Sequence, residues 1–437
     1  MNLTRRRMRR TLAAIVLTAA LSGCTYISDP VSQMKMPRLP EDKATLRTAI
    51  NSMLPPGASL LRPANNDDSS IRTEDLNKDG VLEAIVFYET PDEAVQIHGM
   101  ILEKQGKEWV KRLVFDGEGT ILESVSLRDV TNDGKLDIVV GFSRSEEVLQ
   151  KALVVWSYPG SALEKVLSLP YTRFTIGDLN GDGVDDITVV SFKRNEYATL
   201  SVYQFGGDEF RELDRLSTLN PYVNAYYNIA AGKVAEDKEG VVLDASIGSQ
   251  SAASYVIAME NDRLVQVLPR ADGDTQQTYK ELHINSEDVD DDGIIEIGLL
   301  DRPSGWEYFD SKEVPWLYSY YKWDGKNGMT FVEQQYRDPD GRFTLKFPPE
   351  TQDAVTVDTA SVLNQYLRFI VEDTGETLAE ISFFSQASWD RVKNDGWQLW
   401  ATDGEKYIGY RGKLKQNIDG LKNDKGAGPI ERKGIDE

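Results

Sequence analysis

Acidic and amide side chains recur at a fixed spacing in four nine-residue segments, 75–83, 129–137, 178–186 and 288–296, named loops 1 to 4. Each loop has an oxygen-bearing side chain at positions one, three, five and nine, and glycine at position six. Such a turn directs alternate side chains toward one point, as Ca²⁺ requires with its six to eight or so oxygen ligands. A backbone carbonyl at position seven can supply another ligand. The predicted calcium ligands are Asp75, Asn77, Asp79, Val81 and Glu83 in loop 1; Asp129, Thr131, Asp133, Lys135 and Asp137 in loop 2; Asp178, Asn180, Asp182, Val184 and Asp186 in loop 3; and Asp288, Asp290, Asp292, Ile294 and Glu296 in loop 4.

The same spacing excludes an EF-hand, whose loop ends in a glutamate at position twelve and enters a helix. Position twelve here is Val86, Val140, Val189 or Leu299, each within a short apolar, β-branched-rich run that predicts a buried strand. One Asp-Gly-rich segment could be a simple hairpin turn, but four copies in register favour metal loops. We expect each loop to lead into the innermost strand of one structural unit.

The loops and the strand after each resemble the FG-GAP/VCBS repeat, the calcium-bearing blade unit of integrin-α-like β-propellers. The resemblance implies an all-β fold in which calcium occupies about four structural sites. A catalytic role for the metal is not indicated, because a filled oxygen cage leaves no open coordination position.

Loop spacing predicts the number of repeats. Successive loops begin about 50 residues apart, which suits one four-stranded blade, and a double interval separates loop 3 from loop 4. A fifth unit should therefore lie near residue 233, where Lys233 replaces the first aspartate, and we interpret it as a blade that has lost its metal. We predict a β-propeller of about five blades over 55–340. Six blades and an open β-solenoid are the structural alternatives.

The N-terminal segment is typical of a secretory signal. Arginines precede the apolar run 12–21, which is shorter than the 20 or so residues needed to span a bilayer. The sequence 21–24, Leu-Ser-Gly-Cys, resembles the bacterial lipobox, and this implies a signal peptide over 1–23 and a lipid on Cys24. The expected location is extracytoplasmic, anchored to the bacterial membrane through that lipid. Residues 24–54 are predicted to form a tether and, from 42 onward, a short helix.

The remaining chain is predicted to form a small β-rich or α+β domain over 342–412 and a disordered tail over 413–437. A net charge of −22 argues against nucleic acid as a partner, because phosphate binding needs a basic surface. Cys24 is the only cysteine, which excludes a disulfide framework.

An aromatic cluster between 306 and 323 is a candidate ligand-binding surface, since such rings are enriched at recognition sites. The alternative is that these rings alternate along one strand and fill a core. The candidate residues are Trp306, Trp316, Tyr318, Tyr320 and Trp323.

The sequence contains no recognised catalytic motif. A Ser–His–acid triad would need His98 or His283, and both lie in strand-like runs. We therefore predict a protein that is not an enzyme: a calcium-stabilised, membrane-anchored binding or adhesion module for an envelope protein or glycan. The alternatives are an envelope polysaccharide- or peptide-processing hydrolase with a propeller-top cleft, and a purely structural envelope component.

Overall fold

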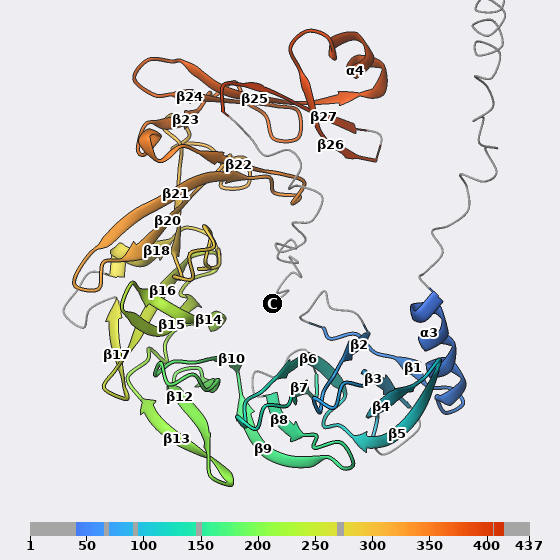
Figure 1. The fold of residues 1–437 in the computed structure, drawn as a ribbon. Helices are drawn as coiled ribbons and strands as arrows, with labels where there is room; N and C mark the ends of the chain where they lie inside the picture. Colours follow the sequence, from blue (N-terminus) through green and yellow to red (C-terminus); the bar gives the residue numbers. More distant parts are fainter. Residues whose placement is uncertain are drawn as a thin grey trace, which may run out of the picture.

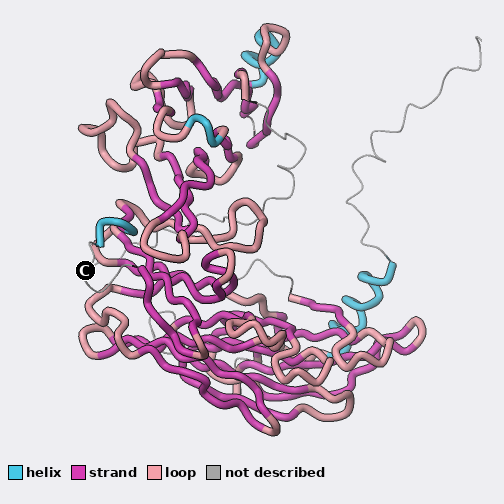
Figure 2. The backbone as a smooth tube through the Cα atoms, turned by 60° about the vertical axis from the view of Figure 1, so that its left-hand side comes forward, coloured by secondary structure: helices cyan, strands magenta, loops and turns pink. Residues whose placement is uncertain are grey.

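The computed structural model describes residues 41–64, 70–90, 95–145, 151–268, 275–404 and 406–414. The predicted signal peptide, the predicted lipidation site Cys24 and the predicted tail from 415 onward lie outside these residues, whereas 413 and 414 of that tail are described. In the described ranges, no helix combines the length and apolar character needed to cross a membrane. Strands dominate the chain and helices are few (Figure 2), so the prediction of an all-β chain is confirmed.

Six antiparallel sheets follow one another along the described chain (Figure 1). They contain β1 (Ser59–Leu60), β2 (Ile71–Glu74), β3 (Glu83–Glu89), β4 (Ile97–Gln105) and β5 (Glu108–Asp116) in the first sheet; β6 (Ile121–Arg128), β7 (Asp137–Ser143), β8 (Lys151–Ser157) and β9 (Glu164–Tyr171) in the second; β10 (Arg173–Gly177), β11 (Asp186–Lys193), β12 (Tyr197–Gly206) and β13 (Glu209–Leu216) in the third; β14 (Ala225–Ala235), β15 (Lys238–Ser246), β16 (Ala252–Glu260), β17 (Arg263–Leu268) and β18 (Tyr279–Lys280) in the fourth; β19 (Ile297–Asp301), β20 (Leu317–Trp323), β21 (Met329–Arg337) and β22 (Thr344–Phe347) in the fifth; and β23 (Val355–Val357), β24 (Tyr366–Val371), β25 (Thr377–Ser385), β26 (Gln398–Asp403) and β27 (Lys406–Gly412) in the sixth.

The sheets stack face to face because their central strands are apolar on both sides. In β7, Ile138 and Val140 pack toward the first sheet, whereas Val139 packs toward the third. Successive side chains of a strand point to opposite faces, so an uninterrupted apolar run serves two neighbouring interfaces. This explains why the run after each loop lacks the polar alternation of a half-exposed strand.

The helix α3 (Glu41–Met53) covers the outer face of the first sheet. Leu46 and Ile50 are buried and pack against Ala84 and Val86 of β3. The amphipathic spacing of 42–54 predicts this helix, which the structure places one residue earlier at each end.

The first strands β2, β6, β10 and β14 lie on the concave side of an arc of sheets (Figure 1). Loops 1 to 3 each connect such a first strand to the second strand of the same sheet. The expectation that a loop leads into the innermost strand is therefore wrong. The innermost strand precedes the loop, and the loop leads into the second strand. Each unit forms its own sheet of four or five strands, unlike a β-solenoid. The number of propeller blades stays a prediction.

The fourth sheet occupies the interval where the fifth repeat was expected. Its strands β14 and β15 are joined by a two-residue turn, Glu236 and Asp237, in place of a nine-residue loop. Lys233 lies within β14, and its carbonyl accepts a hydrogen bond of 2.8 Å from the backbone N–H of Ile295 in loop 4.

The C-terminal sheet shares a hydrophobic core with the fifth sheet, in which Leu345 of β22 packs with Phe369 of β24 and Ile408 of β27. β22 pairs with β21, so the fifth sheet extends to Phe347, beyond the boundary expected near 340–342. One helix in this region, α4 (Gln386–Val392), and two short 3-10 helices, η1 (Thr275–Thr278) and η2 (Pro349–Thr351), complete the elements of the described chain.

Candidate metal centre

The four loops share one backbone conformation. Glycine at position six has φ between 83° and 87° in every loop, as at Gly80 and Gly134. Position four is also left-handed, although it is occupied by Lys78, Asn132, Gly181 or Asp291. Left-handed backbone is uncommon for residues other than glycine, so its recurrence at the same place in four loops marks one conserved turn geometry.

The aspartate at position one organises each turn. In loop 3, Asp178 accepts hydrogen bonds from the backbone N–H groups of Asp182 and Gly183, at 3.2 and 2.8 Å. Asp182 at position five accepts one from the N–H of Val184, at 2.9 Å. Equivalent bonds occur in loops 1, 2 and 4. The carboxylates are thus held in one turn before any metal is considered.

The acid at position nine is fully buried in all four loops: Glu83, Asp137, Asp186 and Glu296. One oxygen of each accepts the backbone N–H of position two, over 2.7 to 3.0 Å. The other oxygen is also buried; in loops 1 to 3 it accepts no hydrogen bond, whereas in loop 4 it lies 3.3 Å from the ammonium group of Lys322. Leaving a buried oxygen without a partner is costly, and this feature recurs in loops 1 to 3, while a lysine faces the same oxygen in loop 4. The donor set therefore fits a divalent cation that prefers oxygen.

Burial raises the pKa of these carboxyl groups, as expected when no cation is present. It raises the pKa of Asp186 to about 6 and that of Glu296 to about 7, with the neighbouring loop carboxylates adding to the effect. The pKa values of Glu83 and Asp137 are raised for the same leading reason. A bound cation would favour the ionised forms instead.

Loop 4 contains a cation of its own. The Nζ atom of Lys322 lies 3.1 Å from Asp290 Oδ2 and 3.3 Å from the otherwise unpartnered Glu296 Oε1, and it also donates to Asp292. Burial alone would lower the pKa of Lys322, but its hydrogen bonds to Asp292 and Asp290 raise it. The ligand oxygens of loop 4 lie within 4.8 Å of one another around this ammonium group.

Equivalent positions in the other sheets have no cationic side chain. Lys322 follows Tyr321, the partner of Ile297 in the β19–β20 register. In each of the first three sheets, the equivalent residue is the one that follows the strand partner of loop position ten. These residues are Glu103, Ser157 and Gln204. Loop 4 is therefore the one among the four in which a lysine faces the position-nine acid. Nothing in the nine-residue pattern indicates this, because Lys322 lies on the following strand.

The other predicted ligand residues, at positions three and seven, already take part in hydrogen bonds within their loops. The hydroxyl of Thr131 at position three donates to Asp137 Oδ2 over 3.0 Å, whereas Asn77 and Asn180 accept the N–H of position five. The backbone N–H groups at position seven, in Val81, Lys135, Val184 and Ile294, donate to the position-five carboxylates.

The predicted aromatic surface is located mainly in the interior. Trp306, Trp316, Tyr320 and Trp323 are buried, and Tyr318 is partly buried. Trp306 donates its indole N–H to the carbonyl of Val357, over 2.7 Å. These side chains fill the cores of the fifth sheet and its neighbours, the alternative that the strand alternation allowed.

His98 has contacts that resemble a catalytic relay. Its Nε2 lies 2.9 Å from the hydroxyl of Thr90, and its Nδ1 lies 3.0 Å from Asp116. Thr90 is buried, while the carboxylate of Asp116 is largely exposed. A substrate would need access to the hydroxyl end, and the structure exposes the opposite end, so this contact indicates a structural histidine.

Comparisons with known proteins add limited information. No family model and no curated protein matches the chain. Among solved structures, it is similar to rhamnogalacturonan lyase YesW, with 11% identity, a TM-score of 0.32 and coverage of 62% of this chain and 68% of that one. It is also similar to the β-propeller domain of the Trilobed protease from Pyrococcus furiosus (12%, TM-score 0.28, 72% and 77%) and to the GH43 β-1,3-galactosidase BT0265 (9%, TM-score 0.29, 82% and 81%).

These comparisons correct one prediction. The chain was expected not to be an enzyme, whereas similar structures include a lyase and a galactosidase. The prediction of a non-catalytic protein is therefore contradicted and is not retained. At these TM-scores, no residue role or substrate is transferred to this chain.

Proposed function

We propose that this chain is a calcium-loaded lipoprotein of the bacterial envelope whose sheets form a propeller-like scaffold that engages a polysaccharide. The observation that carries the metal assignment is the unpartnered buried oxygen at position nine, repeated in loops 1 to 3. Ca²⁺ prefers oxygen ligands in flexible arrangements of six to eight or so. The metal has a structural role here, because loops 1 to 3 each join two strands of one sheet.

Three loops are proposed to hold calcium under ordinary conditions. In loop 4, the ammonium group of Lys322 already forms ion pairs with Asp290, Asp292 and Glu296. A metal ion would have to displace this group, whereas loops 1 to 3 have no such competitor. The proposed resident sites are therefore those that end in Glu83, Asp137 and Asp186.

A lipid on Cys24 is the proposed membrane anchor, supported by the lipobox-like sequence 21–24. Cells producing Cys24→Ser should release the protein into the soluble fraction, because one residue carries the whole lipid attachment and its acyl chains supply about 0.8 kcal/mol per buried CH₂ group. Membrane fractionation with immunoblotting measures this. Ser22→Ala is the matched control and should stay with the membrane. Retention of Cys24→Ser would exclude this anchor.

The polysaccharide role is tested with the mature protein and a panel of bacterial and plant polysaccharides. We expect retention of at least one polysaccharide in millimolar Ca²⁺ and its loss after chelation, because loops 2 and 3 directly follow β6 and β10, which lie on the concave side. Affinity electrophoresis measures retention, and release of reducing or unsaturated ends in the same samples measures cleavage. Absence of retention and cleavage across the panel would contradict the proposal.

A further inference from the structure

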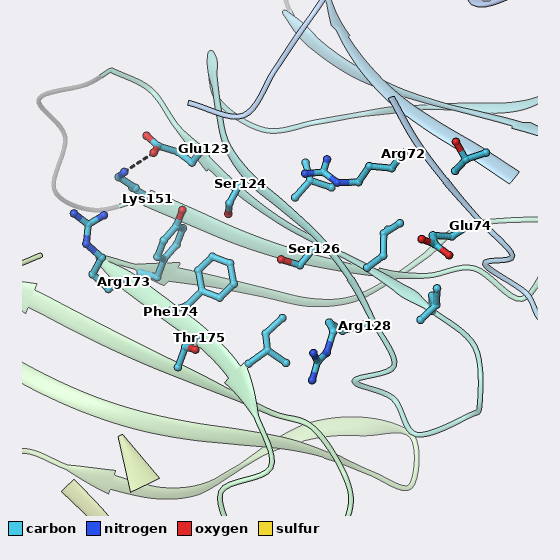
Figure 3. Close-up of a pocket in the computed structure, with 16 residues that line it drawn as sticks. Arg72, Glu74, Glu123, Ser124, Ser126, Arg128, Lys151, Arg173, Phe174 and Thr175 are labelled. Atoms are coloured by element: carbon cyan, nitrogen blue, oxygen red, sulfur yellow. Dashed lines mark hydrogen bonds and ion pairs between the residues drawn. The ribbon is translucent and has the colours of Figure 1, made fainter. Parts of the chain in front are cut away.

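A cavity of about 730 Å³ lies on the concave side of the first three sheets. It is formed by the first strands β2, β6 and β10, with contributions from β8, the end of β9 and loop 2 (Figure 3). Binding sites for small molecules commonly range over about 300–1,000 Å³. This cavity therefore has room for a short stretch of an extended ligand.

The cavity is rich in cationic side chains although the whole chain carries a net charge of −22. Arg72, Arg128, Lys151 and Arg173 line it, against the two acids Glu74 and Glu123. These side chains come from four strands, β2, β6, β8 and β10 (Figure 3). A local excess of positive charge on an acidic protein favours an anionic ligand over a neutral one.

Lys151 and Arg128 each have a carboxylate partner. Lys151 donates to Glu123 over 2.6 Å, and Arg128 makes two hydrogen bonds to Asp185 of loop 3, at 2.8 and 2.9 Å. The second pair joins the cavity wall to loop 3, and Leu136 of loop 2 also lines the cavity. The shape of the cavity thus depends on two of the proposed calcium loops.

Arg173 is a cationic side chain whose N–H donors are only partly occupied by contacts within the protein. Its Nε donates to the carbonyl of Tyr226 over 3.2 Å, which holds the Nε edge of the guanidinium group in place. Among the described residues, no carboxylate forms an ion pair with it. Burial lowers the pKa of Arg173, as expected for a partly desolvated cation lacking a bound anion. Its fork of N–H donors matches a carboxylate in geometry.

The other lining groups suit a sugar. Ser126 and Thr175 offer hydroxyl groups, and the ring of Phe174 lines the same wall, packed at 5.1 Å against Tyr171. Hydroxyl partners beside an aromatic ring and an arginine can recognise sugar hydroxyl groups, an apolar sugar face and a carboxylate together. From these contacts we propose that the cavity binds an acidic oligosaccharide that contains uronic acid, with Arg173 binding its carboxylate.

This inference deepens the proposed polysaccharide role and rests on it. The test uses an immobilised array of uronic-acid polysaccharides, each beside its carboxyl-reduced neutral counterpart, at fixed millimolar Ca²⁺. We expect at least one acidic member to bind about tenfold or more tightly than its reduced counterpart, the size of a charge-assisted contact. Arg173→Gln should remove about the same factor, and Arg173→Lys should remove less. Arg211→Gln, at an exposed arginine of β13, should change nothing.

Arg72→Gln provides a second variant if Arg173→Gln does not fold, and should also weaken binding to the acidic member. Equal binding of acidic and reduced polysaccharides would overturn the inference and leave the polysaccharide role intact. Full binding by both the Arg173 and the Arg72 variants would likewise exclude this cavity. Binding of polyglutamate in preference to every glycan would assign the cavity to an acidic peptide instead. Failure to bind any glycan would remove both the role and the inference.

Discussion

Removing calcium should lower the melting temperature of this protein by on the order of 10 °C. A site filled tenfold above its dissociation constant contributes about 1.4 kcal/mol, so three such sites contribute about 4 kcal/mol. For domains of roughly 150–250 residues, 1 kcal/mol corresponds to about 2–4 °C. The structure supplies the reason: without a cation, each of loops 1 to 3 retains a buried carboxylate oxygen with no hydrogen bond.

The measurement is thermal unfolding of the mature protein in 5 mM Ca²⁺ and after chelation. Restoring Ca²⁺ should restore the melting temperature. Magnesium should restore less, because it demands octahedral geometry and gives up its water reluctantly. An identical melting temperature with and without chelator would show that the loops need no metal.

Replacing Asp244 with asparagine should destabilise the fold by about 3–5 kcal/mol, because it leaves a buried lysine without its counter-ion. Asp244 and Lys280 are both fully buried, and Lys280 Nζ donates to Asp244 Oδ1 over 2.7 Å. Burial alone would raise the pKa of Asp244. The ammonium group of Lys280 outweighs this effect and holds that pKa below its ordinary value. The backbone N–H of Ser286, near loop 4, donates to Asp244 over 2.7 Å, so this pair links the fourth sheet to the segment entering loop 4.

Urea-induced unfolding at saturating Ca²⁺ measures this effect. Asp237→Asn, in the exposed turn between β14 and β15, is the matched control and should lie within about 0.5 kcal/mol of the native chain. The double variant Asp244→Leu, Lys280→Met should recover part of the loss, since it removes both charges together. A loss below 1 kcal/mol for Asp244→Asn would mean that the pair is not a stabilising contact.

The repeat pattern predicts the shared turn of the four loops well because it reports local geometry. Nine-residue spacing fixes which carboxylates share a turn, and the apolar run after each loop predicts a strand buried on both faces. The same local signal cannot reveal which strand of a sheet the loop enters. That depends on hairpin pairing with a preceding segment such as β10, whose five residues are all partly exposed.

The features that the sequence did not predict depend on contacts between strands. Lys322 faces Glu296 only through the register of β19 and β20, and Arg72, Arg128 and Arg173 converge only because three sheets pack side by side. The aromatic residues near 316–323 allow both a surface and a core interpretation, since alternation along a strand specifies two faces without saying which is covered. Tertiary packing places most of these rings in the interior.

The number of calcium ions bound per chain tests the central claim most directly. Equilibrium dialysis of the mature protein against Ca²⁺ up to about 5 mM, above the 10⁻⁴–10⁻³ M range of extracellular modules, should give three ions. Asp186→Ala should give two, Lys322→Gln should give four by freeing loop 4, and Asp237→Ala should leave three. Fewer than one ion per native chain, or no loss in Asp186→Ala, would contradict the assignment of these loops as calcium sites.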